Sequence, residues 1–234
     1  MRLSSLGASD GGRLNLKLAS DPLPADAIKF QAARNAAGRR PVLLAASTHP
    51  GEDEIVLDAY QELAFHPDKP LLVIVPRHPV RGPDIVALAE KRRLKVGRRA
   101  AGAAFGEAPV YVADTLGELG LWFRLAKAAF IGGSLVKGPG GHNPVEPARL
   151  SCPFITGPYT ENWSRIFELF RDEEAVVEIT DAAELARIFA AMLDRPEDAI
   201  AQADRARSIA ELQTGAVEGA VDRLLDLLPS EDEA

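Results

Sequence analysis

Residues 130–150 read Phe-Ile-Gly-Gly-Ser-Leu-Val-Lys-Gly-Pro-Gly-Gly-His-Asn-Pro-Val-Glu-Pro-Ala-Arg-Leu, and this stretch decides our interpretation of the fold. The apolar run 128–131 predicts the end of a buried strand. Residues 132–141 hold five glycines and one proline, which predicts a loop whose backbone comes close to a ligand. Asn143 then stands where a helix N-cap is expected, with Glu146 in the first turn.

A strand, a glycine loop and a capped helix start direct backbone N–H groups and the positive end of a helix dipole at one place. Phosphate is the usual occupant of such a place. The alternative is a tight turn that needs glycine for steric reasons only. The loop also carries Ser134, Lys137, His142, Asn143 and Glu146, which are more polar groups than a simple turn requires, so we favour an anion site.

The composition is that of a globular protein, with 234 residues of which 47% are hydrophobic and 26% charged. The net charge of -7 argues against nucleic acid as a partner. Cys152 is the one cysteine, which excludes an internal disulfide, fits a reducing compartment and predicts a buried structural thiol. No apolar run reaches the ~18 residues of a membrane span, and no signal peptide is visible at Met1. We expect any membrane contact to be peripheral or to come from a missing part.

Apolar runs and capping signals predict alternating strands and helices along the chain. The predicted strands are 41–47, 70–75, 109–113, 128–131, 153–156 and 175–179. The predicted helices are 25–37, 52–65, 84–93, 116–127, 145–150, 161–170, 182–193 with Asp181 as cap, and two that Gly215 separates, beginning at Pro196 and ending near Leu228. Because the strands are apolar throughout, the sequence predicts an α/β fold with a Rossmann-like parallel sheet and helices on both faces.

Four polar clusters each follow a predicted strand, namely residues 47–49, 77–78, 114–115 and 132–146. In open parallel sheets the ligand binds outside the carboxyl ends of the strands. We therefore expect all four clusters to converge on one edge of the sheet.

Several groups in these clusters suit a phosphate. Ser47 and Thr48 offer hydroxyls, and Arg77 offers a bidentate guanidinium. The backbone amides expected to complete the shell are those of Gly140, Gly141, His142 and Asn143. Glu146 is placed to accept hydrogen bonds from two ribose hydroxyls, as acidic residues do in nucleotide-binding folds. The alternative for Glu146 is a charge at a helix N-terminus that stabilises by ~0.3–1 kcal/mol.

The sequence predicts neither a metal site nor a catalytic triad. His49, His78 and His142 lie in strand-end loops, but their spacing matches no metal-ligand signature. No nucleophile-elbow sequence or Ser-His-Asp order is present. The basic residues 91–93 and 98–99 predict a solvated helix end rather than a binding site.

Residues 132–136, 140–144 and 146–147 resemble the signature of the 3-deoxy-D-manno-octulosonic acid (Kdo) transferases, enzymes of Gram-negative lipid A–core assembly. Further segments look familial and occur in family order: 15–17, 44–49 with 51–52, 75–79, 114–115 with 117–120, and 157–158 with 160–162. Two departures stand out. The link 137–139 is about one residue longer than the corresponding link in the family. Leu14 stands where the family commonly has glycine.

The resemblance implies the carboxyl-terminal half of a two-domain GT-B fold. In this family the amino-terminal domain holds the lipid acceptor, a membrane anchor and the general base, and the carboxyl-terminal domain binds the donor, CMP-Kdo. We therefore expect residues 1–20 to be an irregular lead-in truncated from a preceding domain. Residues 21–228 would form the nucleotide-sugar (donor) binding domain, and residues 229–234 a solvated acidic tail.

The reaction implied by the resemblance is inverting transfer of Kdo from CMP-Kdo to a hydroxyl of a lipid A precursor. It implies Arg77 and the loop amides at the phosphate, Glu146 at the ribose, and Ser47, Thr48 and His78 at the donor rim. The general base, the lipid A contact and any membrane contact are expected in the missing half. No catalytic residue, cofactor, metal or nucleic-acid partner is expected for this fragment.

The resemblance implies a whole protein at the cytoplasmic face of the inner membrane, and a fragment that alone is soluble and cytoplasmic. Two other classes remain open. One is a non-catalytic nucleotide-binding or interaction module that kept the fold. The other is a different GT-B glycosyltransferase or a sugar-nucleotide epimerase, which shares the argument for Glu146 and would prefer a uracil nucleotide.

Overall fold

The computed structural model describes residues 21–225. The chain divides into two compact units, Pro22–Ile209 and a second unit made of the residues on either side of it. The lead-in predicted for residues 1–20 and the tail predicted for residues 229–234 lie outside the described residues. The whole sheet belongs to the Pro22–Ile209 unit.

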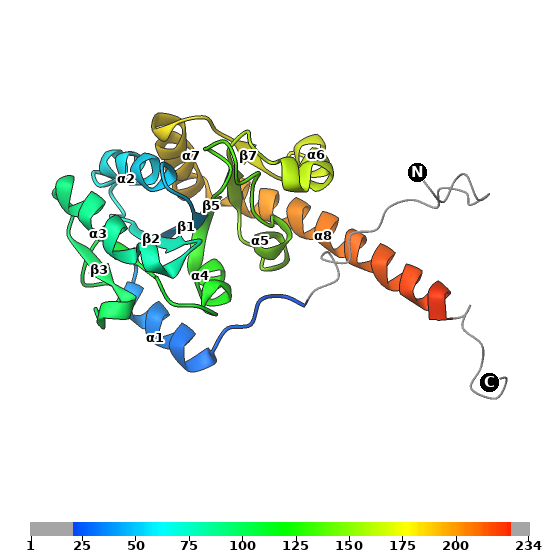
Figure 1. Ribbon diagram of the computed structural model, residues 1–234, viewed down its shortest axis with the longest axis horizontal. Helices are drawn as coiled ribbons and strands as arrows, with labels where there is room; N and C mark the ends of the chain where they lie inside the picture. The colour runs from blue at the N-terminus through cyan, green and yellow to red at the C-terminus, as the bar shows by residue number, and fades with distance from the viewer. Residues whose placement is uncertain (1–20, 226–234) are drawn as a thin grey trace. The chain divides into compact units, whose positions relative to one another are not determined.

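A seven-stranded parallel sheet forms the centre of the Pro22–Ile209 unit (Figure 1). Its strands are β1 Val42–Thr48, β2 Leu71–Pro76, β3 Val96–Arg98, β4 Val110–Val112, β5 Ala126–Ile131, β6 Phe154–Thr156 and β7 Val177–Glu178. They lie in the order β3-β4-β2-β1-β5-β6-β7, and every neighbouring pair is parallel. The predicted α/β class with a Rossmann-like parallel sheet is confirmed.

Strand β1 is the central strand and the place where the strand order reverses. Leu43 and Leu44 point to opposite faces, and both are fully buried. Burial on both faces explains why this strand is a continuous apolar run. The chain passes from β1 to β2 on one side, and later places β5 on the other side. Open α/β sheets bind their ligands outside the carboxyl ends of the strands at such a reversal point, and we call this place, between the loops after β1 and β5, the crevice.

Helices cover both faces of the sheet (Figure 1). They are α1 Ala27–Ala37, α2 Glu52–Leu63, α3 Gly82–Lys91, α4 Leu119–Leu125, α5 Val145–Arg149, α6 Ser164–Asp172, α7 Ala182–Asp194 and α8 Pro196–Leu225, with 3-10 turns at Pro79–Arg81, Arg99–Ala101 and Glu161–Trp163. On one face Leu43 joins an apolar cluster with Leu57 of α2 and Phe189 of α7. On the other face the rings of Tyr111 and Trp122 lie with their centroids 5.9 Å apart.

Three local predictions are confirmed. Helix α1 ends at Gly38, whose φ of 60° is the left-handed conformation that glycine adopts readily. Asp181 caps α7 by accepting a hydrogen bond from the backbone N–H of Glu184 at 2.9 Å. Cys152 is buried, and burial raises the pKa of its thiol to about 12, as expected of a structural rather than a nucleophilic cysteine.

The interpretation of residues 98–99 as part of a solvated helix end was wrong. Val96–Arg98 forms the edge strand β3, which the sequence analysis missed because three residues are too short for a periodic signal. Arg98 Nε lies 2.5 Å from a carboxylate oxygen of Asp114, and Arg99 pairs with Glu118. Hydrogen bonding from Arg99 lowers the pKa of Glu118 to about 2. These arginines therefore hold the β3 edge in place.

Two helix boundaries were also wrong. Helix α4 covers Leu119–Leu125 rather than residues 116–127, because residues 126 and 127 already belong to β5. Helix α8 continues through Gly215 without interruption. An interior glycine costs roughly 1 kcal/mol relative to alanine and does not by itself end a helix. Between residues 21 and 225 no helix, α8 included, is long and apolar enough to cross a membrane.

The packing of α2 against the sheet gives a direct test of the core. We expect Leu57→Ala to lower the free energy of unfolding by about 2–5 kcal/mol, because it removes a fully buried side chain from a close-packed cluster. Phe65→Ala is the control, since Phe65 follows the same helix and is 90% exposed. Chemical denaturation of both variants measures the difference, and equal losses would contradict the packing described for α2.

Candidate functional site: the crevice between β1 and β5

Three histidines meet in the crevice at the carboxyl ends of the central strands. His49 follows β1, His78 follows β2, and His142 lies in the loop after β5. The Nε2 atoms of His49 and His142 lie 2.8 Å apart, and the two rings are stacked with centroids 5.0 Å apart. The ring of His78 stands edge-on to that of His49, with centroids 6.2 Å apart. The structure thus brings together loops that lie far apart in the sequence.

Burial, more than nearby charge, lowers the pKa of both stacked rings. Burial is the main cause that lowers the pKa of His142 to about 4, and the neighbouring His49, Arg77 and His78 act in the same direction. Burial is also the main cause that lowers the pKa of His49. One neutral ring therefore donates its N–H to the other. Because positive charge disfavours protonation here, a bound anion would raise both pKa values and favour the charged forms.

Arg77 and Glu146 face this cluster from two different loops. Arg77 is exposed, and within residues 21–225 its guanidinium makes no hydrogen bond. Glu146 is half-buried, and its Oε1 accepts a hydrogen bond from Asn143 Nδ2 at 3.2 Å. Burial raises the pKa of Glu146, while Asn143 and Arg77 act in the opposite direction. Arg77 is thus near enough to Glu146 to influence its pKa, which is consistent with both residues lying on the same side of the molecule.

The carboxylate of Glu52, the first residue of α2, is the feature that the sequence analysis missed. Glu52 is fully buried and accepts hydrogen bonds from four backbone amides. Its Oε2 receives the N–H groups of His49 at 2.9 Å and Gly133 at 2.7 Å. Its Oε1 receives those of Ser134 and Leu135, both at 2.9 Å. One side chain therefore ties the loop after β1 to the loop after β5.

This contact engages a different part of the glycine loop from the amides predicted to bind the phosphate, which are those of residues 140–143. The amides of residues 133–135 do not face an external anion, because a carboxylate of the chain itself already occupies them. The amide of Gly141 is also engaged, since it donates to the carbonyl of Gly133 at 2.7 Å. The amides of Gly140, His142 and Asn143 make no hydrogen bond with any described residue. These three remain for a ligand.

The helix start after the loop also differs slightly from the prediction. Helix α5 has five residues and begins at Val145, with Pro144 in the N-cap position. Asn143 caps from one residue earlier, because its Oδ1 accepts the N–H of Val145 at 3.0 Å. A helix this short contributes a small dipole. The loop amides and side chains would therefore supply more of the attraction for an anion than the sequence suggested.

Glycine is required where β5 leaves the sheet beside β1. A Cβ on Gly132 would lie 2.6 Å from the carbonyl oxygen of Ser47 and 2.9 Å from Glu52 Oε2. Ser134, two residues later, donates to the carbonyl of Ile131 at 2.6 Å and accepts the N–H of Gly157 at 2.8 Å. The glycine loop is therefore held on both sides, by β1 and by the loop after β6.

Thr48 and Ser47 occupy different positions at the end of β1. Thr48 is buried, and its hydroxyl donates to Asp53 at 2.6 Å. Arg81 pairs with the same carboxylate and also donates to the carbonyl of Thr48 at 3.0 Å. Burial raises the pKa of Asp53, and these two partners act against it. Ser47 has a φ of 58° at the bulge and is partly exposed. A ligand contact stays a prediction for both Ser47 and Thr48. The hydrogen bonds of Thr48 to Asp53 and Arg81 also stabilise the end of β1.

The fourth predicted cluster, residues 114–115, lies at the same sheet edge but serves the structure. Asp114 receives the side chain of Arg98 and the N–H of Ala100, the latter at 2.9 Å. Thr115 donates to Glu118. Both side chains are therefore occupied within the chain.

The longer link at residues 137–139 is braced from the loop after β6. Asn162 donates through Nδ2 to the carbonyl of Pro139 at 2.6 Å, and through its backbone N–H to Gly140 at 2.9 Å. Lys137 Nζ lies 5.9 Å from the centroid of the Tyr159 ring. Among residues 21–225, no three His, Cys, Asp or Glu side chains are grouped so that they could hold a metal ion.

The parallel sheet and the crevice at its reversal point define one Rossmann-like half of a GT-B glycosyltransferase fold. A glycosyltransferase from Rickettsia africae shares this fold with a TM-score of 0.62 and 12% identity, over 92% of this chain and 56% of that one. No protein-family model matches the chain.

Two relatives are much more similar in sequence. The C-terminal CMP-Kdo binding domain of WaaA from Acinetobacter baumannii is 32% identical, with a TM-score of 0.72 over 79% of this chain and 98% of that one. The 3-deoxy-D-manno-octulosonic acid transferase of Haemophilus influenzae is 38% identical over 191 residues. The chain therefore belongs to the Kdo transferase family. The match covers 81% of this chain and 44% of the H. influenzae protein.

The role of Glu52 can be tested through stability. We expect Glu52→Gln to lower the free energy of unfolding by about 3 kcal/mol, because an amide group replaces one acceptor oxygen and leaves buried N–H groups without partners. Glu62→Gln, an exposed change in the same helix, is the control and should cost less than about 0.5 kcal/mol. Similar stability of the two variants in urea denaturation would contradict the role assigned to Glu52.

The neutral state of His142 predicts a pH dependence of stability. Its pKa is about 4 in the folded protein, against 6.5 for the ordinary side chain, so the unfolded chain binds the proton more tightly. The contribution of neutral His142 to the free energy of unfolding is complete above pH ~6.5. It is lost as the pH falls towards ~4, by about 2 kcal/mol after solvent screening. His142→Asn should remove this part of the slope. An unchanged slope in denaturation series across this pH range would show that His142 protonates freely.

Proposed function

We propose that this chain is the donor-binding domain of a Kdo transferase and that it binds CMP-Kdo in the crevice between β1 and β5. The observation that carries the proposal is the likeness to the CMP-Kdo binding domain of WaaA, which extends over 98% of that chain. The proposal agrees with the geometry, because an exposed guanidinium, three amides without a partner among the described residues and a half-buried carboxylate belong to loops at the same edge of the sheet.

In this proposal the phosphate of CMP lies against Arg77 and the amides of Gly140, His142 and Asn143. A guanidinium and backbone N–H groups are the donors that phosphate oxygens prefer. Gly141 then contributes the shape of the loop rather than its amide, which is already bonded. His78 and Ser47 line the rim, where both are accessible.

Glu146 is assigned to the ribose. Asn143 occupies its Oε1, and this leaves Oε2 to accept hydrogen bonds from sugar hydroxyls. Burial disfavours the charged form of this carboxylate, and hydroxyl donors from a ligand would favour it again. Glu146 therefore gains a partner on binding that the free domain does not supply.

The proposed reaction is inverting transfer of Kdo to a hydroxyl of a lipid A precursor. The acceptor oxygen attacks the anomeric carbon, the bond from that carbon to the phosphate oxygen breaks, and CMP leaves with the bonding electrons. Arg77 and the loop amides would stabilise the charge that grows on the departing phosphate. We assign the general base, the acceptor and the membrane contact to the half of the relatives that this chain does not span. The whole protein would act at the cytoplasmic face of the inner membrane.

Calorimetric titration with CMP and UMP tests donor binding. We expect CMP to bind more tightly than UMP. Arg77→Ala and Glu146→Ala should each weaken CMP binding about tenfold or more, since each removes a charge-assisted contact. Arg39→Ala, an exposed arginine beside Gly38 at the opposite edge of the sheet, is the control. Failure of the folded domain to bind CMP, or a preference for UMP, would overturn the assignment of the donor.

Catalysis needs its own experiment, because a domain that binds nucleotide is not thereby an enzyme. We expect Kdo transfer from CMP-Kdo to a lipid A precursor when the chain is joined to the amino-terminal half of the H. influenzae relative. The same fusion carrying Arg77→Ala should transfer far more slowly. Persistent inactivity of a folded fusion that binds CMP would favour a non-catalytic nucleotide-binding module.

A further inference from the structure

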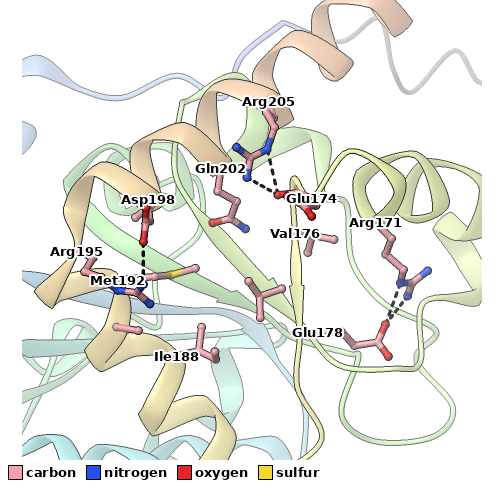
Figure 2. Close-up of a pocket in the computed structure, with 13 residues that line it drawn as sticks. Arg171, Glu174, Val176, Glu178, Ile188, Met192, Arg195, Asp198, Gln202 and Arg205 are labelled. Carbon is pink, nitrogen blue, oxygen red and sulfur yellow. Dashed lines mark hydrogen bonds and ion pairs between the residues drawn. The ribbon is translucent and has the colours of Figure 1, made fainter.

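A cavity lies at the β7 edge of the sheet, opposite the β3 edge, between β7, α7 and the first turns of α8 (Figure 2). Its volume is about 410 Å³, which falls within the roughly 300–1,000 Å³ typical of small-molecule sites. Its apolar wall is formed by Val176, Val177, Ile188, Ala191, Met192 and Ala199. None of the residues that form the crevice between β1 and β5 lines this cavity.

Gln202 of α8 lines this cavity, and its side-chain oxygen is one of two buried side-chain polar atoms without a partner among the described residues. The side chain is 4% exposed, and Figure 2 shows it extending from α8 towards Val176 and Met192. Its Nε2 donates to the carbonyls of Phe154 at 2.7 Å and Ala175 at 3.3 Å. These two acceptors fix the orientation of the amide, because the flipped form would set Oε1 against two carbonyl oxygens.

The other end of the amide has no partner. Gln202 Oε1 is buried and accepts no hydrogen bond in the structure. A buried acceptor without a donor is unfavourable, and native proteins rarely keep one without a reason. Since Gln202 also lines the cavity, a molecule inside it that carries a donor would meet this need.

The rim of the cavity carries no net charge. Its charged residues are Arg171, Arg195 and Arg205 with Glu174, Glu178 and Asp198. Two ion pairs join them, at 2.7 Å between Arg171 and Glu178 and at 3.1 Å between Arg195 and Asp198. Arg205 donates to the backbone carbonyl of Glu174 at 2.8 Å. The rim therefore favours neither an anion nor a cation.

We propose that this cavity binds a small, neutral, mostly apolar molecule that donates a hydrogen bond from a hydroxyl or amide N–H to Gln202 Oε1. Apolar contact with the walls supplies most of the affinity, and the hydrogen bond supplies selectivity. The site does not depend on the function proposed for the crevice, so either assignment can fail without the other.

Two matched probes test this site by NMR. 4-Propylphenol carries a hydroxyl donor, and 4-propyltoluene replaces that hydroxyl with a methyl group of similar size. Met192 is a clean reporter, because the chain has two methionines and the other is Met1. We expect saturable shifts of the Met192 methyl and of the Gln202 side-chain amide, with 4-propylphenol binding about tenfold more tightly, as one added hydrogen bond gives.

The control fills the cavity. Ala191→Phe places a phenyl ring from α7 into the cavity and should abolish the probe-induced shifts at Met192. The affinity for CMP should remain that of the parent protein. Ile188→Phe serves the same purpose from the same wall if Ala191→Phe folds poorly. Equal affinity for the two probes, no saturable shift in the folded parent protein, or shifts that persist in the filled variants would each overturn the proposal.

Discussion

The buried carboxylate of Glu52 is the constraint on which the rest of the site depends. It has no exposed surface, and four backbone N–H groups supply the hydrogen bonds that a buried polar group needs. Those amides belong to the two loops that flank the reversal point of the sheet. A single side chain at the start of α2 therefore fixes the distance and angle between the two walls of the crevice.

This arrangement explains why the histidine pair can exist without a ligand. With both loops fixed by Glu52, His49 and His142 meet at 2.8 Å, and burial keeps them neutral. Arg81 pairs with Asp53, whereas Arg77 makes no ion pair with any residue between 21 and 225. In our proposal this arrangement preorganises the site for an anion, because the Glu52 carboxylate shapes the loop and leaves Arg77 accessible.

Sequence reasoning predicted the sheet, most of the helices and the convergence of the strand-end loops, because these follow from apolar runs, caps and the geometry of parallel strands. It did not predict the task of Glu52. An acidic residue at the first position of a helix has an ordinary explanation in the helix dipole, and nothing local shows which amides it will receive. Strand β3 was missed because its three residues, Val-Gly-Arg, are too short for a periodic signal. The pairing of His49 with His142 likewise spans 93 positions and leaves no local signal.

Hydrogen exchange of the amides of Gly133, Ser134 and Leu135 tests this account most directly. If Glu52 fixes the loop, these amides are protected in the domain without nucleotide, nearly to the level of the neighbouring β5 amides, and CMP adds little. Fast exchange in the free domain, with protection that appears only after CMP binds, would contradict the claim that the crevice is formed in advance.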